Sequence, residues 1–140
     1  MPAANKKKTQ RGKPSSDGFS LVSKVRTQVP NLPYEAMKNA VLGKAFDLSL
    51  VFIGPTRSAR LNSRRGKSTP TDVLSFGLSE TSGEIFICPA RAQAKAKLFK
   101  KDMRAYTGML FIHGLYHLKG MTHGSTMEKA EKKMCKKFGV

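Results

Sequence analysis

The chain has 140 residues, 39% of them hydrophobic, and its 26 lysines and arginines against 9 acidic residues give a formal net charge of +17. This length is typical of one domain with its own core, and no apolar run reaches the roughly 18 to 20 residues that would cross a bilayer. The basic N-terminus leads into no apolar signal segment, and the two cysteines fit no C-x-x-C pattern. We therefore expect a cytoplasmic protein with free thiols.

The charge excess is the first indication of a partner. A field of this sign concentrates polyanions, with nucleic acid as the first candidate and an anionic membrane surface as the second. Tryptophan is absent and the other aromatic residues are scattered, which does not favour base-stacking platforms. The charge therefore predicts attraction to the phosphate backbone and not the reading of a base sequence.

The N-terminal segment, residues 1–17, differs in composition from the remainder. Its positive charges lie at Lys6, Lys7, Lys8, Arg11 and Lys13. Such a segment buries too little apolar surface to offset the loss of chain entropy, so we predict a disordered basic arm. Residues 18–140 are predicted to form a single domain.

The sequence of that domain mixes strand and helix patterns. Short apolar runs bounded by Gly and Pro indicate strands, and apolar residues at three- and four-residue spacing indicate helices. In chain order the predicted elements are a strand at 19–25, a helix at 34–46, a strand at 48–53, a helical turn at 58–62, strands at 72–78 and 84–88, and helices at 90–101, 103–118 and 126–137. The short connection between the last two strands predicts an antiparallel hairpin, and the mixture of elements indicates an α/β or α+β fold.

All three histidines lie within residues 113–123, in the order H-x₃-H-x₅-H. On a helix, His113 and His117 stand one turn apart on the same face. Gly120 permits a left-handed backbone that ends the helix, so His123 can return to the same point. Three imidazoles with one coordination position left open form a catalytic type of zinc site, and we predict one Zn²⁺ per chain. Other first-row metals also accept imidazole ligands.

The same histidine spacing occurs in zinc peptidases, which carry glutamate directly after the first histidine as the general base. Here that position is Gly114, which has no side chain to accept a proton. A phosphodiester substrate is the better match, because its transition state gathers negative charge that a nearby arginine stabilises. The basic run from Arg64 to Lys67 is the candidate for that role.

Two segments together resemble one family. Residues 113–123, HGLYHLKGMTH, resemble the H-G-x-x-H-L-x-G-x-D-H signature of the YbeY endoribonucleases. Asn62, the RGK run at 65–67 and the PTDVLSF run at 70–76 resemble a second signature of the same family, in the same order. The resemblance implies an α+β fold in which a small mixed β-sheet is flanked by helices and the zinc-site helix is central.

By this resemblance the metal ligands are His113, His117 and His123, and Arg65 is the catalytic arginine. We also expect Arg64, Arg65 and Lys67 to contact RNA. The implied activity is zinc-dependent, single-strand-selective cleavage of RNA in the maturation of small-subunit rRNA, in association with ribosomes. No membrane and no small-molecule cofactor is expected.

One departure from the family pattern supports an alternative. Thr122 stands where the family has Asp. If that carboxylate orients a ligand imidazole, its loss lowers metal affinity by about 10- to 100-fold. The alternative function is a non-catalytic rRNA-binding ribosome assembly factor in which the metal is structural.

Overall fold

The structure is a computed structural model that describes residues 18–140, so the arm predicted for residues 1–17 lies outside the described residues. A single sheet forms its centre, with the strand order β1-β2-β4-β3. The strands are β1 (Phe19–Ser23), β2 (Asp47–Phe52), β3 (Val73–Ser79) and β4 (Ser82–Ile87). β1, β2 and β4 pair in parallel, and β3 pairs antiparallel to β4. The predicted antiparallel hairpin is therefore confirmed.

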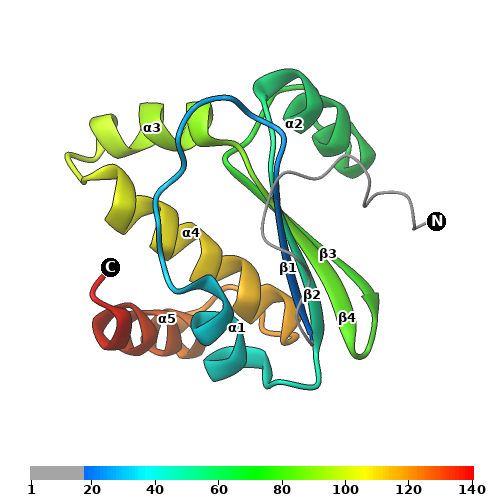
Figure 1. Ribbon diagram of the computed structural model, residues 1–140, viewed down its shortest axis with the longest axis vertical. Coiled ribbons are helices and arrows are strands. Elements are labelled where there is room, and N and C mark those ends of the chain that lie inside the picture. The colour runs from blue at the N-terminus through cyan, green and yellow to red at the C-terminus, as the bar shows by residue number, and fades with distance from the viewer. Residues whose placement is uncertain (1–17) are drawn as a thin grey trace.

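Helices cover both faces of this mixed sheet. They are α1 (Tyr34–Leu42), α2 (Pro55–Asn62), the 3₁₀ helix η2 (Ser63–Arg65), α3 (Pro89–Leu98), α4 (Met103–Leu118) and α5 (Ser125–Phe138). α4 packs against β3, β4, α1, α3 and α5 (Figure 1), so it is the central helix of the domain. The predicted α+β class and the central position of the helix that carries the histidines are both confirmed.

The alternation of side chains along β2 explains why both faces need cover. Leu48, Leu50 and Phe52 belong to the larger core on the α4 side. Val51 and Ile53 point the other way, into a smaller core that includes Leu61 of α2. A strand buried on both faces is expected in the middle of a sheet that is mainly parallel, because helical crossovers cover each side.

Three predicted helix limits were wrong for local reasons. α3 ends at Leu98 and not at residue 101, and Lys100 beyond its end has a positive φ of 56°. α1 ends at Leu42 and not at residue 46, because Gly43 leaves the helix with a φ of 89°. The turn that follows lets Phe46 reach the core, where it is 8% exposed. α2 is a full helix and not a single turn at 58–62, because it begins at Pro55, whose fixed φ suits the first helical position.

A buried hydrogen bond fixes α4 relative to the start of β3. The Tyr106 hydroxyl on α4 donates to Oδ2 of Asp72 at 3.0 Å. Lys95 of α3 places its Nζ 4.0 Å from the same oxygen. Burial, followed by the negative charge of Asp72, raises the pKa of Tyr106, so the phenol stays protonated and remains a donor. The first turn of α4 is capped by Asp102, which accepts from the Ala105 amide at 2.7 Å.

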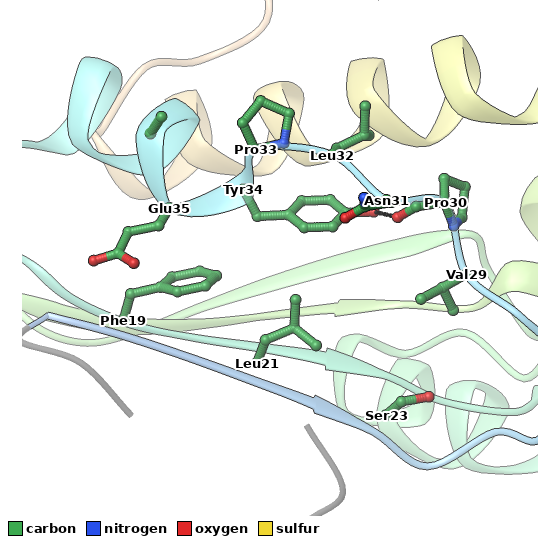
Figure 2. A pocket seen from close by; sticks show the side chains of 11 residues that line it. Phe19, Leu21, Ser23, Val29, Pro30, Asn31, Leu32, Pro33, Tyr34 and Glu35 are labelled. Atoms are coloured by element: carbon green, nitrogen blue, oxygen red, sulfur yellow. Dashed lines mark hydrogen bonds between the residues drawn. The ribbon is translucent and has the colours of Figure 1, made fainter. Parts of the chain in front are cut away.

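An open groove lies at the β1 edge of the sheet, between β1 and residues 29–36. Figure 2 shows Phe19 and Leu21 of β1 on one side of it and the ring of Tyr34 on the other. The Tyr34 hydroxyl donates to the Pro30 carbonyl at 2.6 Å and so holds the turn before α1. No histidine lines this groove.

Within residues 18–140, no helix combines the length and apolar character needed to span a membrane.

Candidate metal centre

His113 and His117 lie one turn apart in the C-terminal half of α4. Their Nε2 atoms are 3.0 Å apart, and the two rings meet edge to face with centroids 4.5 Å apart. Both side chains are partly buried, and the helix around them is apolar on nearly every side. A helix of this kind is held rigidly by its neighbours, so the two imidazoles are presented in a fixed relation.

The turn after α4 brings in the third histidine. Gly120 has a φ of 99°. Its amide donates to the His117 carbonyl, and the Met121 amide donates to the Tyr116 carbonyl, both at 3.0 Å. This pair of bonds is the Schellman motif that ends a helix at a glycine. The chain reverses there, and the His123 ring lies 5.2 Å from that of His113 and 4.8 Å from that of His117.

The three rings therefore meet at one point, as the sequence predicted. One ring nitrogen from each can be chosen so that all three lie within 4.8 Å of one another. Two nitrogens that bind one tetrahedral ion at about 2.0–2.1 Å are about 3.3 Å apart. The 3.0 Å between the Nε2 atoms of His113 and His117 is close to that value. The donor set thus fits a first-row metal ion, and His123 is exposed, so the centre faces solvent on one side.

The electrostatics of the cluster favour the form of histidine that binds metal. The pKa of His117 is lowered first by burial, then by the neighbouring His113 and His123, with a smaller contribution from Arg65, while Glu131 acts in the opposite direction. A metal ligand must be a neutral imidazole. The surroundings of His117 therefore keep its ring in the binding form at neutral pH.

Glu131 is the contact that sequence reasoning missed. It lies on α5, and its Oε2 is 2.6 Å from Nδ1 of His113. The only signal for it in the sequence is position, since it stands next to Ala130 and between Met127 and Met134, the apolar stripe of that helix. The sequence of this stripe does not show that Glu131 lies beside the histidines, because the contact depends on how α5 packs against α4.

Gly114, the residue after the first histidine, is a packing residue. A Cβ atom built on it would lie 3.0 Å from Cδ1 of Ile85 and 3.1 Å from Oγ of Ser75. The Ser75 hydroxyl makes a long contact of 3.5 Å to the Gly114 carbonyl. The sheet therefore approaches α4 so closely that any side chain at this position, including the glutamate of a zinc peptidase, would displace Ile85 and Ser75.

The basic loop that follows α2 is held by side chains of that helix. Asn62 donates to the Thr69 carbonyl at 2.8 Å, and Ser58 donates to the Thr71 carbonyl at 2.8 Å. Arg64 and Arg65 end η2, and Lys67 follows Gly66, which has a φ of 80°. All three basic residues are exposed. Arg65 is near enough to the cluster for its charge to act on the pKa of His117.

Three imidazoles that face solvent, with the exposed Arg65 near enough to act on one of them by its charge, form a candidate metal centre suited to an anionic substrate in an α+β domain. Comparison with known proteins identifies the family to which the chain belongs. The family model described as Endoribonuclease YbeY matches residues 16–139. The chain therefore belongs to the Endoribonuclease YbeY family, a family of metal-dependent RNA hydrolases.

Individual relatives agree with this assignment. Endoribonuclease YbeY of Halalkalibacterium halodurans is 32% identical over 133 residues, which cover 82% of this chain and 82% of the relative. The Petrotoga mobilis protein of the same name is 33% identical over 108 residues, covering 75% and 76%. A solution structure of a Thermotoga maritima protein superposes with a TM-score of 0.55 at 25% identity, covering 73% of this chain and 76% of that one.

Proposed function

We propose that the protein is a zinc-dependent endoribonuclease that cuts single-stranded RNA during maturation of small-subunit rRNA, in the cytoplasm and in association with ribosomes. The observation that carries the proposal is the convergence of three imidazoles beside Arg65. The net charge of +17 supports a polyanionic substrate. Membership of the Endoribonuclease YbeY family supports RNA as that polyanion.

Each site residue has a distinct task in this proposal. His113, His117 and His123 would hold the ion, and a bound zinc would supply a Lewis acid for the phosphoryl oxygen and lower the pKa of water. Arg65 donates to the phosphate that is cut and offsets its growing negative charge. Arg64 and Lys67, exposed on the same loop, attract neighbouring phosphates and so hold the strand over the centre.

The test is a cleavage assay on one RNA sequence, offered as a single strand and as a duplex. We expect cleavage of the single strand only, loss of cleavage in a chelator, and recovery when zinc is added back. Elemental analysis of the purified protein should find about one zinc per chain. RNA binding without cleavage at full zinc loading would favour the alternative, a non-catalytic assembly factor with a structural metal, which Thr122 at the position of the family's Asp is consistent with.

Arg65→Ala is expected to lower the cleavage rate by about 100-fold, the usual effect of removing one preorganised donor from a developing oxyanion. Zinc content should not change, because Arg65 is not a ligand. The matched control is Arg64→Ala, because Arg64 is the neighbour of Arg65 in η2. This variant loses only attraction to phosphate, so its cleavage rate should fall by no more than about tenfold. Single-turnover rates at saturating protein separate the two effects. An equal loss in both variants would move the catalytic role away from Arg65.

A further inference from the structure

The lysines of helix α5 (Ser125–Phe138) are all exposed, yet one of its two acidic residues is largely covered. Met127 is buried and Met134 partly buried where α5 packs on the main core. Glu131 lies on this inner side, with a side chain only 19% exposed. Glu128, one turn earlier on the same helix, is exposed. Two acids of the same type on one helix therefore have different surroundings.

The geometry of the contact is specific. Oε2 of Glu131 lies 2.6 Å from Nδ1 of His113, which is short for a nitrogen–oxygen hydrogen bond and typical of a charge-assisted one. The other nitrogen of the same ring, Nε2, faces Nε2 of His117 at 3.0 Å. An imidazole that donates from Nδ1 to a carboxylate keeps the lone pair on Nε2, the atom that points into the cluster.

We propose that Glu131 is a positioning residue for the metal centre: by accepting the Nδ1 proton of His113 it fixes the tautomer and the ring orientation that direct Nε2 to the ion. A carboxylate that accepts from the second ring nitrogen of a ligand histidine is a common support in metal sites. It also places a negative charge beside a cation in a chain of net charge +17. Thr122, next to His123, has no carboxylate, so α5 supplies one from a different part of the fold.

The proposal rests on the proposed function only in taking the three histidines as the metal site. Its test is zinc affinity, measured without RNA by competition with a chromophoric chelator. A protein that binds zinc but cuts no RNA would refute the nuclease and leave this test intact. Conversely, if the protein cuts RNA but its zinc affinity does not change when Glu131 is substituted, only the positioning role is refuted.

Three variants make the test specific. Glu131→Ala is expected to weaken zinc binding by about 10- to 100-fold, the usual effect of removing a carboxylate that supports a ligand histidine. Glu131→Gln keeps an oxygen acceptor without the charge and should fall between Glu131→Ala and the wild type. Glu128→Ala, the control, removes the same charge from the exposed side of α5 and should bind zinc as the wild type does.

Two further measurements separate positioning from a loss of structure. Thermal unfolding of the metal-free proteins should show that Glu131→Gln still folds, because glutamine fills the same space, with a melting temperature lowered by no more than the loss of one charge-assisted hydrogen bond explains. In long-range ¹H–¹⁵N spectra of the zinc-loaded wild type, His113 should show protonated Nδ1 and unprotonated Nε2. The Nδ1 proton should move upfield or exchange away in Glu131→Ala. Unchanged zinc affinity in Glu131→Ala and Glu131→Gln, or an equal loss in Glu128→Ala, would overturn the proposal.

Discussion

His117→Ala is expected to remove metal-dependent RNA cleavage. The substitution takes away one of the three proposed ligands, and one whose surroundings favour the neutral ring. Because an ion in such a site supplies several kcal/mol of charge stabilisation, the rate should fall by at least about 1000-fold. Zinc content should drop well below one ion per chain. RNA affinity should change little, since it depends on the basic residues.

The comparison requires a control prepared in the same way. Gln93→Ala, at an exposed position on α3, serves this purpose and should keep full activity. Cleavage and zinc content are measured on the same samples, with RNA binding followed by fluorescence anisotropy. Cleavage that persists equally in His117→Ala and Gln93→Ala would come from a contaminating nuclease, and the enzyme proposal would then be lost.

Gly114→Glu is expected to unfold the domain and not to create a peptidase. The glycine is buried, and even a Cβ atom would come within 3.0 Å of Ile85 and 3.1 Å of Ser75. A glutamate adds a charge with no partner at this depth, and together the two effects should cost more than about 3 kcal/mol of unfolding free energy. Urea denaturation measures this directly, and low soluble yield would accompany it.

Gly77→Glu is the matched control for this prediction. Gly77 lies on β3 and is exposed, and a Cβ atom added to it would meet no heavy atom within 4 Å. The same change of residue should therefore cost no more than about 1 kcal/mol. If Gly114→Glu were as stable as Gly77→Glu, the close approach of β3 and β4 to α4 would be disproved.

The candidate centre was largely predictable because its ligands are local in sequence. Helical spacing places His113 beside His117, and Gly120 predicts the bend that returns His123. The order of the strands was not predictable from the pattern, because the parallel pairing of β1 with β2 and of β2 with β4 depends on how helices pack across the sheet. Glu131 was missed for the same reason, since its partner lies on another helix and the contact is purely tertiary.

The end of α1 shows a different kind of failure. Met37, Val41 and Ala45 recur with helical spacing, so the periodicity continues past the real end of the helix. The backbone at Gly43 overrides it, because a φ of 89° suits a glycine that leaves a helix. A glycine at the end of an apolar repeat is thus better evidence for a boundary than the repeat is for continuation.

The three histidines of the candidate centre come from a single helix and the turn after it, and this has a consequence for how the protein would tolerate the loss of a bound ion. Gathering donors that are only four and six residues apart closes short loops, which carries a small entropic cost. An ion bound in this way links one helix end to the turn that follows it and does not cross-link distant strands. Removal of the ion should leave the sheet and both apolar cores folded, so that the centre can bind metal again without refolding of the chain.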